Sequence, residues 1–548
     1  MTLVDPERAP LPELLGAVDQ AVRSGDLLRA SELAEAALGR GVEHPGLSHL
    51  AGWRLHQQGR YEAALERLQR ANALAPDDAD ILNSLGLCLN RLGRASEADR
   101  AYHAALARRP AFPQAWYNKG AALRDAGMLE EAQRCFERAV ELSPGYAEPL
   151  AALAASAAQR RDLEQARTLA ERALAASPAL HSAELTLAEV EIAERDHAAA
   201  AERLRRLLSE LALTPVNRAV SLALLGDALD GQERFSEAFE AYTRSKHELR
   251  SLHAARYEAP GVESARNLAD RLGRYFGGGS GSSWSARAAP PGSAVARTHV
   301  FLVGFPRSGT TLLEQILASH PEVVALEERE CLAEAGAPFL SSDEGLDRLA
   351  RVTAPEAGER RDAYWAEVRR FGVEPQGRVF VDKMPLNSVL LPAAAKLFPE
   401  AKVLWARRDP RDVVLSCLRR RFGMTASMYE LTTLEGAAAY YDAVMSLNET
   451  YARVLDQDRL VLRYEDLVRD FEAETRRICA FLGLEWSETL KAFAQTARRR
   501  AVNTPSAPQV AQGLFKEGMG RWRRYTDQLA PVLPTLNAWA ARFGYPAD

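Results

Sequence analysis

The sequence predicts a multidomain chain with two architectures, an all-α solenoid of helical repeats followed by an α/β domain built on a parallel sheet. Three observations support this prediction: a 34-residue repeat in the first half, a break rich in glycine, serine and proline at residues 277–296, and a strand–loop–helix succession after it. A length of 548 residues also exceeds what one ordinary hydrophobic core supports, so several domains are expected.

The repeat is clearest in its small and large apolar positions. Small residues let two antiparallel helices approach, Leu82 and Tyr102 fill the space between them, and a proline ends the second helix. Leu82, Leu85, Gly86, Leu89, Gly93, Ala98, Tyr102, Ala105 and Pro110 recur as Trp116, Lys119, Gly120, Leu123, Gly127, Ala132, Phe136, Ala139 and Pro144. The pattern resembles the tetratricopeptide repeat. We assign residues 11–275 to this array, with degenerate outer copies and a clearer one returning at Leu222.

Such an array carries no chemistry of its own. The concave face of a repeat solenoid typically binds an extended peptide or another protein, and the competing interpretation is a scaffold that only packs against its neighbour. The sequence identifies no ligand for it. The segment 277–296 has no hydrophobic periodicity and is predicted to be a flexible linker.

Composition excludes several classes of function. The net charge of -5 offers no basis for nonspecific nucleic-acid binding. The sequence has neither an N-terminal targeting segment nor an apolar run of the roughly 18 residues that a membrane span needs, so a cytoplasmic location is expected. The cysteines lie far apart without metal-ligand spacing, and we expect them to be reduced and buried.

A phosphate-binding loop opens the second half. Thr298–Gly304 has the form of a buried strand, FPRSGTT follows as a turn, and TLLEQILASH reads as an amphipathic helix that ends before Pro321. A helix N-terminus after a glycine-containing turn is an anion site. The match to GxxxxGK[ST] has Gly304 and Gly309 in place, but Thr310 stands where the lysine belongs.

The missing lysine argues against a nucleoside triphosphate and weakens the case for a metal. Arg307 can instead donate two hydrogen bonds to one phosphate, with the hydroxyls of Ser308, Thr310 and Thr311 beside it. The loop therefore predicts a ligand phosphorylated at a 5′ position and lacking a triphosphate chain.

The PRSGTT loop resembles the 5′-phosphosulfate-binding loop of sulfotransferases, which use 3′-phosphoadenosine 5′-phosphosulfate (PAPS) as donor. A second match is KVLWARRDPRDVVLSCLRR, where Arg408 follows a predicted strand and Ser416 lies eight residues further on. The resemblance covers residues 297–545 and is nearest to the tyrosylprotein sulfotransferase branch. It implies that Arg307, Ser308, Gly309, Thr310 and Thr311 hold the 5′ end and that Arg408 and Ser416 hold the 3′-phosphate. A charged turn with internal ion pairs is the alternative for RRDPRD.

Sulfuryl transfer to a hydroxyl is helped by a base. The resemblance implies this role for Glu327, with Glu328 and His320 as alternatives. It also implies that Lys383, after the strand-like VFVD, stabilises the leaving oxygen. Leu326 and Glu330 depart from the pattern of the tyrosylprotein branch, which weakens a tyrosine-peptide assignment more than the chemistry.

The C-terminal matches to donor-contacting residues are Tyr464 in LVLRYEDLV, and Ser506 and Arg521 in the irregular segment 503–525. Trp522 either stacks on the nucleotide or packs in the core.

The function expected from these residues is transfer of a sulfuryl group from PAPS to an acceptor hydroxyl, without a metal. The repeats favour a peptide or protein acceptor such as a tyrosine, although a sugar, lipid or small phenol fits the same donor site. A kinase is disfavoured by the missing lysine. The remaining alternative is an inactive nucleotide-binding scaffold whose repeats bind partners.

Overall fold

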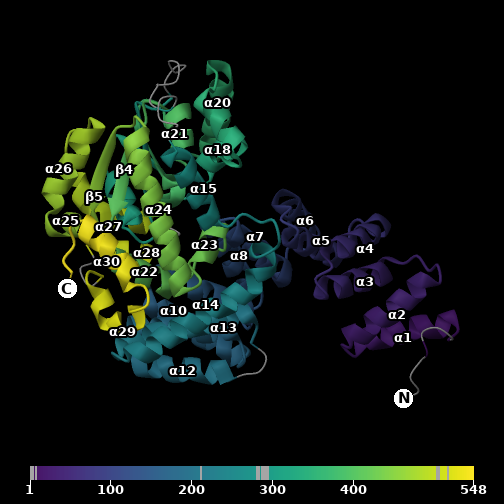
Figure 1. The fold of residues 1–548 in the computed structure, drawn as a ribbon. Helices are drawn as coiled ribbons and strands as arrows, with labels where there is room; N and C mark the ends of the chain where they lie inside the picture. The colour runs from purple at the N-terminus through teal and green to yellow at the C-terminus, as the bar shows by residue number, and fades with distance from the viewer. Residues whose placement is uncertain are drawn as a thin grey trace. The chain divides into compact units, whose positions relative to one another are not determined.

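The structure is a computed structural model that describes residues 5, 9–209, 213–278, 284, 295–500, 506–514 and 518–547. The chain divides into two compact units, Met1–Glu194 and Arg195–Asp548. In Figure 1 the first unit runs from purple to blue and the second from blue to yellow.

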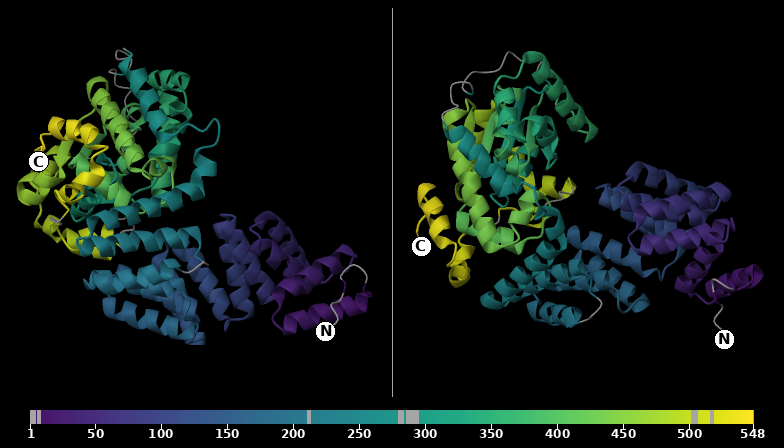
Figure 2. Two further views of the ribbon diagram at one scale, coloured as in Figure 1. Left: turned by 60° about the horizontal axis from the view of Figure 1, so that its bottom comes forward. Right: turned by 45° about the vertical axis from the view of Figure 1, so that its right-hand side comes forward.

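In the first unit, α1 to α10 pair as successive antiparallel hairpins, and α11 packs against α9 and α10 (Figure 2). The helices are α1 (Leu11–Arg23), α2 (Leu27–Gly39), α3 (Pro45–Gln57), α4 (Tyr61–Leu74), α5 (Ala79–Arg91), α6 (Ala95–Arg108), α7 (Pro113–Asp125), α8 (Leu129–Leu142), α9 (Ala147–Gln159), α10 (Leu163–Ala176) and α11 (His181–Ala193). The predicted helical repeat is confirmed.

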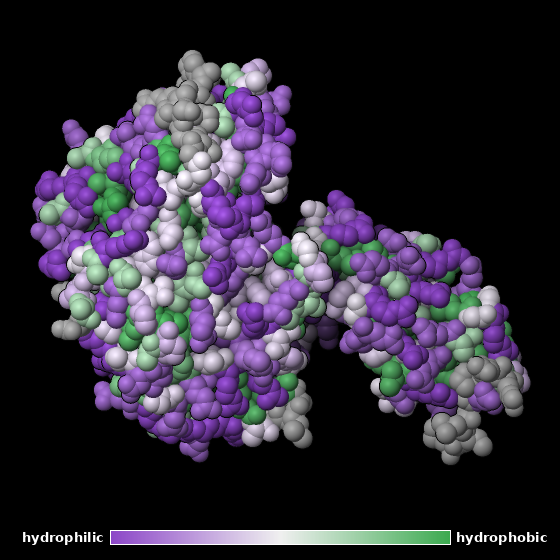
Figure 3. All heavy atoms as spheres, viewed as in Figure 1, coloured by the Kyte–Doolittle hydropathy of each residue, from purple (hydrophilic) through white to green (hydrophobic). Residues whose placement is uncertain are grey.

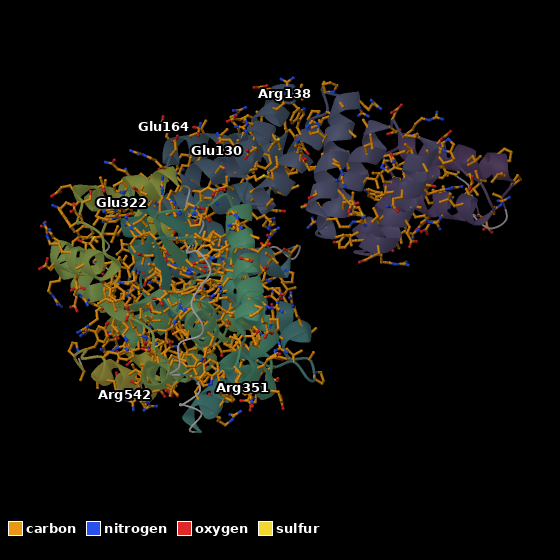
Figure 4. The ribbon with its side chains drawn as sticks, turned by 90° about the horizontal axis from the view of Figure 1, so that it is seen from above. Glu130, Arg138, Glu164, Glu322, Arg351 and Arg542 are labelled. Atoms are coloured by element: carbon orange, nitrogen blue, oxygen red, sulfur yellow. The ribbon has the colours of Figure 1, made fainter. Side chains whose placement is uncertain are left out.

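Close contact within a hairpin explains the glycine of each clear repeat. A Cβ atom on Gly86 would lie 2.6 Å from the Tyr102 ring, and one on Gly120 would lie 2.7 Å from the Phe136 ring. No side chain fits at such distances, so the large residue of one helix requires glycine on the other. Charged side chains on the outer faces of α8 and α10, such as Glu130, Arg138 and Glu164, point into solvent (Figure 4).

The second unit begins with four more helices, α12 (His197–Ser209), α13 (Pro215–Gly231), α14 (Phe235–Tyr257) and α15 (Ala265–Gly277). The hairpin α13–α14 repeats the glycine contact, since a Cβ on Gly226 would lie 2.4 Å from the Tyr242 ring. Most of the predicted linker lies outside the described residues. Within it Trp284 is described and buried, with its ring centroid 4.8 Å from that of Phe276. The domain boundary at residues 277–296 stays a prediction.

A five-stranded parallel sheet follows, in the order β2-β3-β1-β4-β5. Its strands are β1 (Thr298–Gly304), β2 (Val323–Glu327), β3 (Val379–Lys383), β4 (Lys402–Arg407) and β5 (Arg459–Arg463). Because all strands are parallel, their carboxyl ends lie at one edge of the sheet, where open α/β sheets bind ligands.

Alternating side chains of the strands enter two separate hydrophobic clusters. Phe301 and Val303 of β1 join one cluster, whereas Val300 and Leu302 join the other. Helices therefore pack on both faces, as near-continuous apolar strands require. They are α17 (Thr310–Ala318), α18 (Cys331–Leu340), α19 (Asp343–Ala350), α20 (Ala354–Arg370), η1 (Pro385–Ser388), α21 (Leu391–Leu397), α22 (Pro410–Arg419), α23 (Ala426–Glu430), α24 (Leu434–Val454), α25 (Tyr464–Arg469), α26 (Phe471–Leu482), η2 (Glu488–Ala492), α27 (Phe493–Arg499), α28 (Ala507–Val510), η3 (Arg521–Tyr525), α29 (Thr526–Leu529) and α30 (Leu533–Arg542).

The helix after the phosphate loop differs from its predicted amphipathic character. Residues Thr310 to Leu317 of α17 are all buried, including Glu314 and Gln315. The reason is that α17 packs against β2 and β3 as well as against α27 and η2. A charged side chain in this helix must therefore find a partner inside the protein.

The cysteines and the polarity of the helices were also predicted from the sequence. All five cysteines are free and buried, as predicted. In the described part of the chain, every helix is too short or too polar to cross a bilayer. Hydrophilic residues cover most of the visible face in Figure 3.

Candidate functional site

The phosphate loop turns sharply between β1 and α17. A Cβ atom on Gly304 would lie 2.7 Å from the carbonyl oxygen of Ala406 in the neighbouring strand, so β1 can end here only with glycine. Gly309 precedes α17 at φ 98°, a left-handed conformation that favours glycine. Thr310 and Thr311 are buried in the first turn of α17. The loop thus ends at the N-terminus of a helix whose first backbone N–H groups lack intrahelical partners.

Arg307 is the residue of this loop with the most unusual surroundings. It adopts a left-handed φ of 73° and is 8% exposed. Its guanidinium donates to Ser416 Oγ and Gln509 Oε1, both at 3.0 Å, and to Ser506 Oγ. Burial, with smaller effects of Arg420 and Arg408, lowers its pKa to about 9. Among the described residues no carboxylate pairs with Arg307, so its charge is buried with neutral partners alone.

Arg408 follows β4 and is arranged in a similar way. Its guanidinium donates to the carbonyl oxygens of Arg307, at 3.4 Å, and of Gly518, and it lies 4.9 Å from the centre of the Tyr464 ring. In the described ranges it too has no carboxylate partner within ion-pair distance. A buried cation, Arg307, next to a half-buried one, Arg408, with no ion-pair partner for either among the described residues, indicates a site for an anion.

Two clefts share Arg307, Arg408 and Gln509 in their linings. The cationic cleft, as we name the first, adds Ser416 and further arginines; its arginines are Arg307, Arg408, Arg419, Arg420 and Arg521, and its one described carboxylate is Asp412. The second cleft is lined by Gly309, Leu312, Tyr464, Ser506 and Val510. One cleft thus suits a multiply charged anion, and the other offers backbone, a hydroxyl, an aromatic ring and apolar groups.

Sequence reasoning missed Arg419, Arg420 and Gln509. Arg420 had a usable signal, because it lies four residues after Ser416, a spacing that predicts the same side of a helix, although α22 itself ends at Arg419. Gln509 lies in α28, about 200 residues from Arg307, and no local pattern pointed to it.

A second group of charged residues lies at the ends of β2 and β3. Lys383 is fully buried, with its Nζ 2.8 Å from Glu328 Oε1 and 3.3 Å from Glu314 Oε2. Glu314 also accepts from Arg500 at 3.1 Å. Burial acts to lower the pKa of Lys383, but Glu314 and Glu328 raise it above its ordinary value. Lys383 is therefore a fixed cation in this group.

Glu327 ends β2 beside Lys383 in the register of the two strands. Its Oε1 atom is buried and has no hydrogen-bond partner among the described residues. Burial, reinforced by Glu314, raises the pKa of Glu327 to about 7 against the opposing effect of Lys383. Of the two glutamates that the sequence left open, Glu328 is engaged by Lys383, whereas Glu327 has an unpartnered oxygen and a proton affinity suited to general base catalysis.

The third candidate base lies elsewhere. His320 precedes β2, at the end of the strand opposite to the carboxyl edge. Its Nε2 donates to the Glu485 carbonyl at 2.8 Å, and its Nδ1 accepts from the Glu322 amide at 3.2 Å. Both ring nitrogens are thus occupied by hydrogen bonds to the backbone.

Of the C-terminal candidates, some lie at the clefts and one packs in the core. Tyr464 follows β5 as the first residue of α25, and Ser506 contacts Arg307. Arg521 borders the cationic cleft and forms an ion pair with Asp230 of α13. Trp522 is buried with the Arg411 guanidinium 3.9 Å from its ring centre, which favours packing over stacking on a nucleotide. Residues 501–505 and 515–517 of the predicted donor-binding segment lie outside the described residues.

The predicted residues therefore form two groups at one edge of the sheet. Glu327 and Lys383 line neither cleft. The predicted residues that line one cleft or both are Arg307, Gly309, Arg408, Ser416, Tyr464, Ser506 and Arg521. Helix α17 connects the groups, since it starts at Thr310 in the loop and contributes Glu314 one turn later.

Comparison with known proteins separates the chain into repeats and a second domain. Residues 299–488 match the model of the sulfotransferase family, and residues 52–93 and 113–146 match tetratricopeptide repeat models. A protein-tyrosine sulfotransferase of Drosophila melanogaster is 26% identical over 266 residues, which are 43% of this chain and 51% of that protein. Protein-tyrosine sulfotransferase 2 of Gallus gallus is 29% identical over 267 residues, covering 45% and 69% of the two chains. An uncharacterized protein of Aquifex aeolicus is 27% identical over 256 residues, which are 43% of this chain and 32% of that protein.

The chain spans about a third to half the length of the first two curated relatives it matches. A solved tetratricopeptide repeat protein from Parabacteroides merdae aligns with 43% of this chain and 93% of its own at a TM-score of 0.34 and 18% identity. The chain thus combines N-terminal tetratricopeptide repeats with a domain of the sulfotransferase family that is distantly similar to protein-tyrosine sulfotransferases.

Proposed function

We propose that the protein transfers a sulfuryl group from PAPS to an acceptor hydroxyl. The observation that carries this proposal is a pair of neighbouring guanidinium groups beside the phosphate loop, the buried Arg307 and the half-buried Arg408. Among the described residues neither of them forms an ion pair with a carboxylate. Membership of the catalytic region in the sulfotransferase family supports the choice of donor.

The charges of the two clefts fit that donor. The loop Ser308–Thr311 and the start of α17 would hold the 5′-phosphosulfate. Arg408 and Ser416, in the cationic cleft, would hold the 3′-phosphate, and Arg307 lies between the two positions because it bonds Ser416 from within the loop. Tyr464 and the apolar lining of the second cleft would contact the nucleoside.

The reaction needs a proton acceptor and support for the leaving group. PAPS supplies an activated sulfur–oxygen bond, which breaks as the acceptor oxygen bonds to sulfur and leaves adenosine 3′,5′-bisphosphate. Glu327 would take the acceptor's proton, because its pKa of about 7 lets it be ionised and still basic near neutrality. Lys383 would stabilise the developing charge on the leaving oxygen; Glu328, whose side chain is 37% exposed, can turn outward to release it.

For the acceptor we propose a hydroxyl carried on a peptide, such as a tyrosine. The distant similarity to protein-tyrosine sulfotransferases supports this class, and the repeats offer a protein-binding surface in the same chain.

Calorimetric titration tests the donor class directly. Adenosine 3′,5′-bisphosphate, without added metal, is expected to bind the wild-type chain at micromolar concentration and ATP far more weakly. Arg408→Ala should abolish bisphosphate binding, whereas Arg459→Ala, at the far end of the neighbouring strand, should retain it. Folded protein that ignores the bisphosphate would overturn the proposal, and binding without transfer from PAPS to any hydroxyl offered would favour the inactive scaffold.

A further inference from the structure

Two acidic residues near the end of α13 are unfavourable in their local context. Asp227 and Asp230 lie three residues apart, on one side of the helix, and α13 ends at Gly231. Negative charges near a helix C-terminus oppose the helix dipole, and like charges at this spacing repel. Both side chains are also largely buried, at 17% and 4% exposure. Their presence therefore needs compensation from another element.

The compensation comes from arginines of the cationic cleft. Asp227 pairs with Arg420 at 2.9 Å and with Arg419 at 3.2 Å. Burial acts to raise the pKa of Asp227, but these two arginines hold it below its ordinary value. Asp227 is therefore ionised and bound to both guanidinium groups.

Asp230 makes a second set of contacts from the next turn. Its carboxylate pairs with Arg521 and, at 3.4 Å, with Arg419, and it accepts a hydrogen bond from the Tyr525 hydroxyl. Tyr242 of α14 adds to the same network, since its hydroxyl donates to Asp227 at 2.8 Å and accepts from Arg419 at 3.2 Å.

We infer that Asp227 and Asp230 are positioning residues of the donor site, which hold Arg419, Arg420 and Arg521 in place around the cleft that receives the 3′-phosphate. The inference rests on the proposed function, because it assigns the donor's phosphate to that cleft. It makes the hairpin α13–α14 a part of the site, although the sequence predicts this hairpin as part of the repeat array.

Holding the arginines in advance favours binding because each free arginine side chain loses rotamer freedom when a ligand fixes it. The carboxylates also repel an incoming phosphate, but each is already paired with two guanidinium groups, which offset most of its field. We therefore expect the loss of position to outweigh the loss of repulsion when an aspartate becomes asparagine.

The test compares two ligands that differ only at the 3′ position. Adenosine 3′,5′-bisphosphate and adenosine 5′-monophosphate are titrated into the full-length wild type, Asp227→Asn and Asp230→Asn. The matched control is Glu237→Gln on α14, whose carboxylate pairs with Arg234 in an exposed position. Thermal unfolding of each variant reports whether it is folded.

Both aspartate variants should lose about tenfold in bisphosphate affinity with less than about a twofold change for the monophosphate. The control should match the wild type. An unchanged ratio of the two affinities would mean that the aspartates contribute only to packing. A raised bisphosphate affinity would mean that they only neutralise the arginines and repel the phosphate. Either result overturns the inference but leaves the donor class intact. A wild type that binds no bisphosphate overturns the proposed function itself.

A milder variant covers the case in which Asp230→Asn fails to fold. Tyr525→Phe keeps every charge and removes one hydrogen bond to Asp230, so a loss of roughly twofold to threefold in bisphosphate affinity is expected. If neither this variant nor Asp227→Asn changes the ratio of affinities, the positioning role is wrong.

Discussion

The hairpins α5–α6 and α13–α14 have the same construction and opposite chemistry. In each, a glycine contacts an aromatic ring across the pair, Gly86 with Tyr102 and Gly226 with Tyr242. The Tyr102 hydroxyl is buried without a hydrogen-bond partner among the described residues, whereas the Tyr242 hydroxyl bonds Asp227 and Arg419. One hairpin therefore only closes a helix pair, and the other has acquired buried charge.

The ion pairs made by the two hairpins also differ in how far they are buried. Arg109 and Asp80 pair with side chains 43% and 52% exposed, whereas Arg419 and Asp230 pair at 8% and 4%. Exposed pairs contribute little to stability, while a buried charge deprived of its partner is costly. A repeat can thus be converted from a scaffold element into part of a site by a few buried charges.

The largest expected difference lies between these two arginines. Arg419→Ala should destabilise the protein by about 3–5 kcal/mol, because Asp227 and Asp230 lose a buried partner, whereas Arg109→Ala should cost at most about 1 kcal/mol. Urea unfolding followed by tryptophan fluorescence measures both. Equal costs would contradict the contrast between the hairpins.

The next contrast is between the proposed catalytic base, Glu327, and its neighbour Glu328. Glu327→Gln should lower kcat roughly a hundredfold, since the acceptor proton loses its base, and leave bisphosphate affinity unchanged. The neighbouring Glu328→Gln should have a smaller effect. Single-turnover transfer from PAPS to a tyrosyl peptide or p-nitrophenol provides the rates, and unchanged turnover in Glu327→Gln would remove that residue as base.

The two tyrosines form a matched pair at equivalent positions. Tyr242→Phe should cost about 1–3 kcal/mol, because Asp227 loses a buried hydrogen bond, whereas Tyr102→Phe should be neutral or slightly stabilising. Thermal or urea denaturation of both variants decides the point. A similar cost at Tyr102 would mean that its hydroxyl is satisfied after all.

The smallest expected effect concerns pH. Burial and, after it, the carboxylate of Glu314 raise the pKa of Glu327, so Glu314→Gln should lower that pKa. Activity requires ionised Glu327 and falls as the pH drops through its pKa; the acid limb of kcat/KM should therefore move to lower pH. Glu330→Gln serves as the control and should leave the profile in place, and an unmoved limb in Glu314→Gln would separate Glu314 from the base.

Much of the fold follows from local pattern. The period of 34 residues predicted the hairpins because each glycine and its large partner recur together, and the parallel sheet followed from short apolar strands before turns. Arg307 was predicted from the phosphate loop, and Arg408 and Ser416 from the resemblance to sulfotransferases. The structure brings the three side chains to one cleft, and their roles stay predictions.

The remainder depends on contacts between distant segments. Asp230 meets Arg521 across 291 residues, and Lys383 meets Glu314 through the packing of α17 against the sheet. The sequence predicted α17 as amphipathic because one turn carries Glu314 and Gln315, and only tertiary structure reveals that these side chains are enclosed. Local propensity contains no information on which buried carboxylate neutralises which cation.

The contacts of α13 also bear on how such chains recombine in evolution. A gene fusion that joined a new repeat array at the glycine-rich segment after α15 would discard Asp227 and Asp230 and leave Arg419 without its counter-ions. Exchange upstream of Pro215 would keep them. The segment inherited as one module therefore begins within the repeats, and substitutions at Asp227 should be accepted only together with changes at Arg419 or Arg420.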